Sequence, residues 1–501
     1  MIRSIHRYLL SALLVLFASG GCTEAGSDND SGHPSLHLQL KRIDARSVTL
    51  QATSRRATQI RYICKTTGVL SSESVQSVME HGEMLPADPE LVIEGLEAET
   101  FYTLFAVACD QAGRCSTLQH IQFTTGEPAS SMYPWESERD GLPTFTDLVL
   151  CYGGSHHRIP FRWDKERFAP MVSYTDPDGK EQWLFDAFLF IEFQDTPGSD
   201  NRNYAYMTGL LRENGFSAGK RQWQELIDYW FQGSSGFEAL DQAIAEAAQR
   251  LGTPPSKRKV VMTLPDPILH RVFDKKGNGS GDPASTVYWG ELEGRTQDFS
   301  NSEHRVAACK WYINEVRRRF DQGKFRNIEL AGFYILSEEI ATPDEGWDYE
   351  LKQTDKVIPH VAAYLHSLNE SLSWIPYNRA AGYTKWKEMG VDYAYMQPNY
   401  FWKPELSLER FFADIRQHGL NMEFELDENV FNGKADCEAY RKRFRQYLSE
   451  ARKQGIYGSR PLSYYQGTNA FYDLSRSQSP EEQALYHEFC QFVINNPMRK
   501  N

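Results

Sequence analysis

The spacing of apolar and polar residues changes its period once along the chain, near residue 143. Before that point, short runs alternate apolar and polar residues, and turn residues separate them. The runs are 36–40, 47–50, 59–64, 100–109 and 119–124. Alternation with period two is typical of half-buried strands, and short strands at this spacing are typical of a β-sandwich. We therefore predict an all-β domain over residues 35–126, followed by a linker over 127–143.

Beyond residue 143, strand-like apolar runs alternate with stretches of helical periodicity. The clearest helical stretches are 304–320, 357–368, 407–418, 437–455 and 480–495. The strand candidates are 146–152, 187–193, 259–264, 328–336, 372–377, 392–397, 420–426 and 461–466. Eight strand–helix units in succession predict an α/β fold, a (β/α)8 barrel over residues 144–497. The alternative is an open doubly wound sheet, but no glycine-rich nucleotide-binding turn follows the first strand.

The first residues have the pattern of an export signal. Basic residues precede an apolar run over 8–17, which is too short to span a bilayer, and small residues lead to Cys22. This resembles a bacterial lipoprotein signal over 1–21, which implies that Cys22 carries the lipid and that 22–34 is a tether. We expect a lipid-anchored protein of the cell envelope, in the outer membrane and facing the periplasm or the cell surface. A plain secreted protein cut near this point is the alternative.

Composition narrows the class of partner. The net charge of −13 argues against nucleic acid, and against an anionic membrane surface as a partner other than through the lipid anchor. The chain is rich in aromatic residues, with 11 Trp and 26 Tyr. Aromatic rings suit a protein that stacks against sugars, although a large core would also use them.

Export permits disulfide bonds. Cys109 and Cys115 flank a turn between two strand-like runs, so a bridge between them is expected. The remaining cysteines beyond the signal are scattered in apolar surroundings without the close spacing of a zinc site, so we expect buried thiols. They are Cys64, Cys151, Cys309, Cys437 and Cys490.

Carboxylates lie at the ends of two strands that face each other across the mouth of a barrel. Glu423, Glu425 and Asp427 share one face of the seventh strand, and Glu338 follows the fourth. Hydrolysis of a glycosidic bond needs two carboxyls, one protonated and one ionised. As in many retaining glycosidases, we expect Glu338 to be the general acid/base and Glu425 the nucleophile. A slip of one residue in register would exchange Glu338 for Glu339.

Other strand ends carry aromatic, amide and hydroxyl groups, which a sugar subsite needs for stacking and hydrogen bonding. The residues that we expect to bind substrate are His156, Glu192, Tyr377, Asn378, Tyr395, Gln397, Asn399, Glu423, Asp427 and Tyr465. For any single ring, packing in the core is the alternative. His156 and His157 are adjacent and point opposite ways in an extended chain, so we predict no metal site, and no cofactor is expected.

Five segments of the barrel region together resemble one known family. They are 148–153, 332–334, 374–377, 396–400 and 423–427, and the family is catalogued as domain of unknown function 4855. The resemblance covers residues 144–495 and implies an exported bacterial protein, of the kind common in gut Bacteroidetes, with a glycosidase-like barrel. It implies no particular activity.

Two details qualify the acidic residues. Ser337 precedes Glu338, at a position where many glycosidases have an Asn that holds the sugar 2-hydroxyl. Acidic residues near strand ends also cap helices or lie in solvated loops, and this alternative applies to Glu339 and Glu428.

The β-sandwich region also has a recognisable signature. Leu96, Thr100 and Tyr102 match the pattern L-x-x-x-T-x-Y, and 106–110 follow as a strand. The pattern resembles fibronectin type III domains, which implies a spacer or binding module without chemistry of its own.

These observations together predict an exported glycoside hydrolase that acts on a poly- or oligosaccharide, with possible glycan-utilisation partners at the cell surface. The alternative is a non-catalytic glycan-binding lipoprotein on the same barrel. A third possibility, an adhesion or scaffold protein, would have no site at the barrel mouth.

Overall fold

A computed structural model describes residues 33–43, 46–66, 73–87, 90–97, 100–125, 141–153, 161–192, 204–205, 216–267, 272–273, 279–280, 288–292, 295–346 and 349–499. The predicted signal peptide with Cys22, most of the linker, and His156 lie outside the described residues. The chain forms two compact units, which are described separately. Among the described residues, no helix combines the length and the apolar character that crossing a membrane requires.

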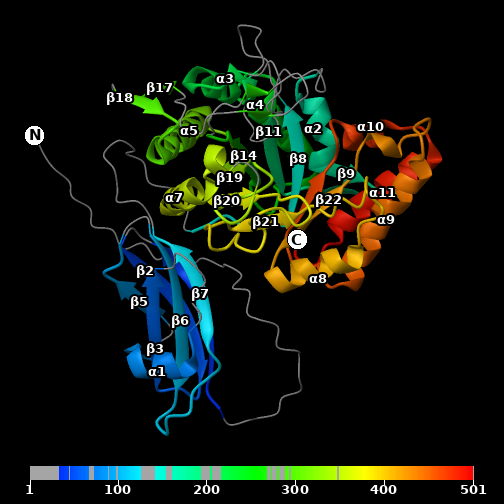
Figure 1. The fold of residues 1–501 in the computed structure, drawn as a ribbon. Coiled ribbons are helices and arrows are strands. Elements are labelled where there is room, and N and C mark those ends of the chain that lie inside the picture. Colours follow the sequence, from blue (N-terminus) through cyan, green and yellow to red (C-terminus); the bar gives the residue numbers. More distant parts are fainter. Residues whose placement is uncertain are drawn as a thin grey trace, which may run out of the picture. The chain divides into compact units, whose positions relative to one another are not determined.

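The first unit contains a sandwich of two antiparallel sheets (Figure 1). One sheet has the order β1 (Ser35–Ile43), β2 (Ser47–Arg55) and β5 (Glu90–Glu94). The other has the order β4 (Glu83–Pro86), β3 (Gln59–Thr66), β6 (Phe101–Cys109) and β7 (Gln119–Thr124), with the helix α1 (Val75–His81) before β4. The predicted strands are all present, and the predicted fibronectin type III-like sandwich is confirmed.

The signature at the start of β6 has a structural role. The hydroxyl of Tyr102 accepts a hydrogen bond from the backbone N–H of Glu97, at 2.9 Å. This contact is a tyrosine corner, which fixes the entry to the strand that follows. The core between the sheets is built from alternating side chains such as Leu38, Leu50 and Leu104.

Cysteines confirm part of the prediction and correct part of it. Cys109 and Cys115 form a disulfide at the end of β6, and Cys151, Cys309 and Cys490 are buried thiols. For the two remaining cysteines in the described residues the prediction of burial was wrong. Both are only half-buried, because the first lies near the end of β3 and the second is the first residue of α9 (Cys437–Lys453). These are Cys64 and Cys437.

The second unit is a closed barrel of eight parallel strands, and each of the eight predicted strands is confirmed. In chain order they are β8 (Asp147–Gly153), β11 (Ala187–Glu192), β14 (Arg258–Leu264), β19 (Ile328–Ile335), β20 (Ser371–Trp374), β21 (Tyr393–Met396), β22 (Asn421–Glu425) and β23 (Leu462–Tyr465). β23 pairs with β8 and closes the barrel. The (β/α)8 class is therefore correct.

Helices surround the barrel (Figure 1). They are α2 (Lys165–Val172), α3 (Lys220–Trp230), α4 (Gly236–Leu251), α5 (Ser302–Gly323), α6 (Tyr349–Lys352), α7 (Thr354–Ser367), α8 (Leu408–His418), η1 (Glu428–Val430), α9 (Cys437–Lys453), α10 (Ala470–Arg476) and α11 (Pro480–Ile494). Short strand pairs interrupt the first half: β9 (Ser173–Thr175) with β10 (Glu181–Trp183), β12 (Tyr204–Ala205) with β13 (Phe216–Ser217), β15 (Val272–Phe273) with β16 (Gly279–Ser280), and β17 (Tyr288–Leu292) with β18 (Arg295–Asp298).

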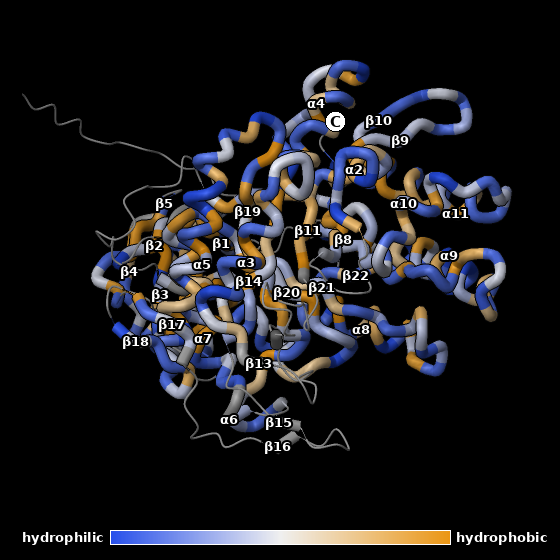
Figure 2. The backbone as a smooth tube through the Cα atoms, turned by 90° about the horizontal axis from the view of Figure 1, so that it is seen from above, coloured by the Kyte–Doolittle hydropathy of each residue, from blue (hydrophilic) through white to orange (hydrophobic). Residues whose placement is uncertain are grey.

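Hydrophobic residues concentrate along the barrel strands, and the helices around them carry both hydrophobic and hydrophilic residues (Figure 2). Strand β22 shows how the two faces differ. Phe424 packs against Tyr447 of α9 and Phe492 of α11, so it faces the helices. Because side chains alternate along a strand, Glu423 lies on the opposite face, toward the barrel interior. The tertiary fold therefore buries an acidic face that a surface strand would leave in water.

Candidate active site

Glu338 lies just beyond β19 and is held by one amide. The Nε2 group of Gln397 donates to Oε1 of Glu338 at 2.8 Å. Burial raises the pKa of Glu338, and the hydrogen bond from Gln397 offsets part of that rise. The residue itself is half-buried, so its carboxyl is both perturbed and within reach of a ligand.

The neighbours of Glu338 have structural roles. Ser337 is buried, and its hydroxyl donates to the backbone carbonyl of Glu339 at 3.0 Å. Glu339 is buried and forms an ion pair with Lys352, and the hydroxyl of Tyr377 donates to it at 3.2 Å. Glu338 rather than Glu339 therefore carries the carboxyl that is available at the barrel mouth.

Glu425 is fully buried, and both of its oxygens are occupied. The backbone N–H of Asn399 donates to Oε1 at 2.7 Å, with the side-chain amide at 3.3 Å, and the hydroxyl of Tyr447 donates to Oε2 at 2.6 Å. Burial raises the pKa of Glu425 to about 7, although these hydrogen bonds lower it. With 0% exposure, Glu425 supports the residues around it and is shielded from a ligand.

Glu423 is different, although it shares a strand face with Glu425. It is 3% exposed, and its Oε1 has no hydrogen-bond partner among the described residues. Burial raises its pKa well above the usual range, and the nearby carboxyls of Glu425 and Glu338 raise it further. A buried polar atom without a partner is uncommon in a folded protein and marks a candidate functional group.

Further polar groups line the interior on the same side of the barrel. The hydroxyl oxygens of Ser373, Tyr395 and Ser463 are also buried without a hydrogen-bond partner among the described residues. They come from β20, β21 and β23. β21 and β23 are the neighbours of β22 in the barrel, and β20 is the next strand beyond β21. Tyr395, which we expected to bind substrate, is fully buried in this interior.

Aromatic side chains surround the two carboxyls. The charges of Glu338 and Glu423 add to the effect of burial in raising the pKa of Tyr152 and of Tyr334, so these groups lie close together. The ring of Tyr465 lies edge-on to Tyr152, with the centroids 5.7 Å apart.

Trp402 continues this aromatic group. Its ring lies edge-on to that of Tyr465, with the centroids 5.6 Å apart. Its Nε1 donates to Oδ2 of Asp427 at 2.8 Å. Asp427 also accepts from the backbone N–H of Asn429 at 2.8 Å and so caps η1. Its role is to position Trp402 and the following turn.

Of the remaining predicted residues, some support neighbouring side chains, and one has a side chain outside the described residues. Asn378 donates its backbone N–H to Oδ1 of Asn399 at 2.9 Å, so it supports the amides at the mouth. Glu428 accepts hydrogen bonds from Thr468 and Asn469, which hold its pKa low despite burial, so it is structural. Glu192 ends β11, but its side chain lies outside the described part of the chain.

Sequence reasoning missed Tyr447 entirely. It lies on α9, and its hydroxyl also accepts a hydrogen bond from the backbone N–H of Phe401 at 2.7 Å. Tyr152 and Tyr334 were not named as site residues either, although Tyr334 shares a strand face with Glu338 in the sequence. Their alternation within β8 and β19 could have placed them on the interior face, whereas no local pattern links Tyr447 to Glu425.

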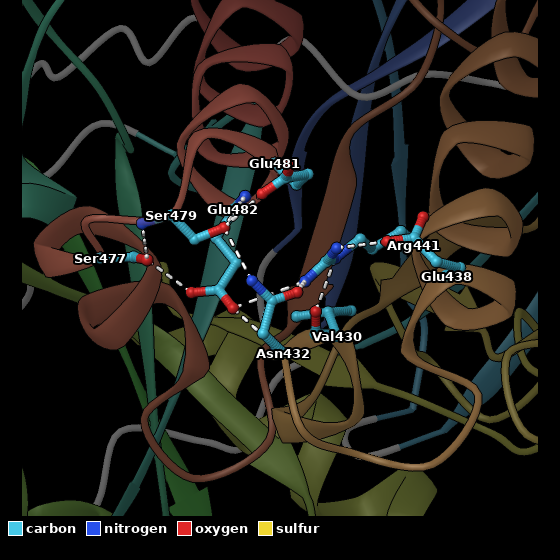
Figure 3. Close-up of polar contacts among 8 residues, drawn as sticks. All are labelled: Val430, Asn432, Glu438, Arg441, Ser477, Ser479, Glu481 and Glu482. Carbon is cyan, nitrogen blue, oxygen red and sulfur yellow. Dashed lines mark hydrogen bonds and ion pairs between the residues drawn. The ribbon is translucent and has the colours of Figure 1, made fainter.

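A buried arginine anchors the segment that follows η1 (Figure 3). Arg441 of α9 is fully buried and donates to the carbonyl of Val430 at 2.7 Å, to Oδ1 of Asn432 at 2.7 Å and to Glu438 at 2.6 Å. It also pairs with Glu482 of α11 at 3.4 Å, and Glu482 accepts from the backbone N–H of Asn432 at 2.7 Å. This network joins the segment after β22 to the two helices α9 and α11.

No group of three or more His, Cys, Asp or Glu residues in the described ranges has the arrangement of a metal site.

Solved structures with similarity to the chain include fibronectin type III domains. The fn3 domain of human collagen alpha-1(XX) chain is 22% identical, with 22% of this chain and 96% of that chain covered and a TM-score of 0.17. The FN5 domain of Drosophila Lar is 14% identical, with 19% and 96% covered and a TM-score of 0.14. Chitinase ChiA74 from Bacillus thuringiensis is 20% identical, with 21% of this chain and 16% of that chain covered and a TM-score of 0.15. These likenesses indicate no activity.

Among curated proteins, the DNA-directed RNA polymerase subunit Rpo1N of Sulfolobus acidocaldarius is 28% identical over 103 residues. The match covers 21% of this chain and spans only 10% of the length of that subunit. The family comparison covers far more, because the profile of one family matches residues 147–491, essentially the whole barrel. The chain therefore belongs to the family described as Domain of unknown function (DUF4855).

Proposed function

We propose that the barrel is a glycoside hydrolase in which Glu338 and Glu423 are the two reacting carboxyls. The family and the barrel fold fit a glycosidase-like domain. The observation that carries the proposal is the pair itself: two carboxyls from β22 and the end of β19, both with raised pKa values, beside aromatic side chains at one end of the barrel. Active sites of such barrels lie at the carboxyl ends of the strands.

Glu423 takes the place that the sequence suggested for Glu425. Both point to the same face of β22, but Glu425 has its two oxygens bonded to Asn399 and Tyr447. Glu423 has an oxygen without a described partner. A carboxyl that reacts with substrate needs a free oxygen, whereas a fully bonded one orients its neighbours. We assign Glu425 to that positioning role.

Tyr377 supports a carbohydrate as the substrate. It is 39% exposed, and no other aromatic residue is among the exposed large hydrophobic side chains of the described ranges. Its hydroxyl is held by Glu339, which in turn pairs with Lys352, so the ring has a defined orientation. The charge of Glu338 contributes to the raised pKa of Tyr377, so the ring lies near that carboxyl. An exposed, oriented ring beside a reacting carboxyl suits stacking against a sugar.

Export and anchoring remain part of the proposal. The apolar run over 8–17 and Cys22 support a lipid-anchored protein of the cell envelope. A poly- or oligosaccharide substrate fits that location, and the sandwich would then serve as a spacer. A non-catalytic glycan-binding protein is the second outcome that the experiment below distinguishes.

The test is a screen of the purified protein against plant and host polysaccharides, with soluble products measured by chromatography. On a responsive glycan, Glu338→Gln and Glu423→Gln are each expected to lower the turnover rate by about 100-fold or more. Glu405→Gln replaces an exposed carboxylate of the segment after β21 and serves as the matched control. Unchanged turnover in both test variants would refute the assignment, and retention of glycan without products would establish binding alone.

A further inference from the structure

A continuous chain of amides connects the two carboxyls that the sequence singled out. Glu425 accepts from the side-chain amide of Asn399 at 3.3 Å. The same Nδ2 group donates to Oε1 of Gln397 at 3.0 Å, and Nε2 of Gln397 donates to Glu338 at 2.8 Å. In this chain Asn399 donates to both Glu425 and Gln397, and Gln397 accepts from Asn399 and donates to Glu338, so the two carboxyls at the ends only accept.

Two backbone groups set the direction of the chain. The backbone N–H of Asn378 can only donate, and it meets Oδ1 of Asn399 at 2.9 Å. This contact places Nδ2 of Asn399 toward Gln397, which must then present its oxygen to Asn399 and its Nε2 to Glu338. The carbonyl of Ile375, which can only accept, lies 3.4 Å from the same Nε2 and agrees with that orientation. Exchange of oxygen and nitrogen in either amide would oppose two acceptors or two donors.

Asn399 is held in an unusual backbone conformation to do this. Its φ of +53° is in the left-handed region, which Asn tolerates better than most residues. In this conformation both its backbone N–H and its side chain reach Glu425. The geometry of Asn399 therefore serves the amide chain as well as the turn after β21.

The two reacting carboxyls thus differ in their donors. Glu338 has a fixed donor on Oε1, whereas Oε1 of Glu423 has none among the described residues. A hydrogen bond to a carboxylate favours its ionised form, and burial without a donor favours the neutral form. When two acids lie near each other in a buried site, the one with the donor ionises first.

We propose that Gln397 and Asn399 are positioning residues that fix Glu338 as the ionised partner and leave the proton of the pair on Glu423. This inference rests on the proposed function and reverses the roles expected from the sequence, because the acid then comes from β22. The order of proton affinities itself, however, does not depend on which substrate the protein uses.

The surrounding titratable groups are compatible with this order. Glu338 interacts electrostatically with Tyr152 of β8, Tyr334 of β19 and Tyr377 after β20. Burial raises the pKa of each of these tyrosines, so they stay neutral and add no charge beside either carboxyl. Glu423 faces Glu425 in addition to Glu338, and this second acid strengthens its hold on a proton.

In hydrolysis, the proton of Glu423 passes to the glycosidic oxygen as the bond from that oxygen to the anomeric carbon breaks. Glu338 then either removes a proton from the water whose oxygen bonds to that carbon, or bonds to the carbon itself until water displaces it. Both routes consume one water and end with one proton shared by the pair, so no further reactant is needed.

The test measures proton affinities without a substrate. Full-length protein labelled with ¹³C at the glutamate carboxyl carbons is titrated by NMR, and Glu338→Gln and Glu423→Gln assign the two resonances. Glu338 is expected to ionise at lower pH than Glu423. Gln397→Met removes the donor, and Asn399→Asp turns the Gln397 amide around, so each should raise the pKa of Glu338 by about one to two units. Gln446→Met is the control, because the amide of Gln446 accepts a hydrogen bond from Tyr400. This substitution should leave the pKa of Glu338 unchanged.

Ionisation of Glu423 before Glu338 would overturn the proposal, as would an unchanged pKa of Glu338 in both Gln397→Met and Asn399→Asp. On a responsive glycan, the acid limb of the pH–rate profile should move upward in these variants by the same shift. If the titration order holds but no glycan is hydrolysed, the proposed function fails while the assigned proton order stands.

Discussion

The buried carboxyl of Glu425 predicts a specific dependence of barrel stability on pH. Its pKa is about 7 in the folded protein, against 4.5 for an exposed glutamate. The folded state therefore binds this proton more tightly than the unfolded state. The stabilising contribution is fully present below pH 4.5 and is lost as the pH rises to about 7. The difference of pKa values corresponds to about 3 kcal/mol in the free energy of unfolding.

Glu425→Gln removes this titration, because an amide stays neutral at every pH. Unfolding by urea, followed by tryptophan fluorescence, reports on the barrel, since the sandwich has no tryptophan and Trp135 is the first in the chain. Between pH 4.5 and about 7, the wild type should lose about 3 kcal/mol more stability than Glu425→Gln. Asp147, whose pKa is also raised to about 7, by burial and by Asp186, contributes equally to both proteins and cancels.

Glu428→Gln is the matched control, with the opposite sign. The folded-state pKa of Glu428 is lowered, so its contribution is present above the unfolded value of 4.5 and is lost as the pH falls through the folded value. Its replacement should therefore cost most near neutral pH. Parallel stability curves for the wild type and Glu425→Gln over the whole range would refute the reasoning, because they would mean that Glu425 ionises normally in the barrel.

Two further substitutions test the framework around the site. Arg441→Met leaves buried acceptors and Glu482 without their cation and should lower the free energy of unfolding by about 3–5 kcal/mol. Arg445→Met breaks an exposed pair with Glu488 and should lower it by less than about 1 kcal/mol. Equal losses in urea unfolding would contradict the role given to the buried network. Tyr102→Phe removes the acceptor for the backbone N–H of Glu97 and should destabilise the sandwich by about 1–2 kcal/mol. Calorimetry can follow the sandwich transition, and an unchanged midpoint would count against a tyrosine corner.

Much of the fold followed from local patterns. The alternation in the first domain and the strand–helix succession in the second are set by nearest neighbours along the chain, so both architectures and all eight barrel strands were predictable. The disulfide between Cys109 and Cys115 spans a single turn, so it was also predictable from residues that are close in the sequence. Burial of Cys64 and Cys437 was predicted from apolar neighbours and failed, because exposure depends on which face of an element meets the core.

The site was only partly predictable for the same reason. The alternation of side chains and the strand order predicted that Glu423, Glu425 and Glu338 lie toward one end of the barrel. The same alternation places both glutamates of β22 on one face, so it could not predict which of them is available to react. Their difference comes from Asn399, after β21, and from Tyr447, which lies 22 residues beyond Glu425. These donors occupy Glu425, whereas Oε1 of Glu423 has no hydrogen-bond partner in the part of the chain that the structure describes.

The sequence by itself thus determined the two architectures and the strand ends at which acids gather, since hydrophobic period and chain order are local properties. Only the tertiary structure decided that Glu339 pairs with Lys352 and that Asn399 and Tyr447 donate to Glu425. It also decided that Oε1 of Glu423 is buried with no hydrogen-bond partner among the described residues. The physical reason is that the pKa and hydrogen bonding of a carboxyl depend on burial and on donors that other strands and helices bring to it.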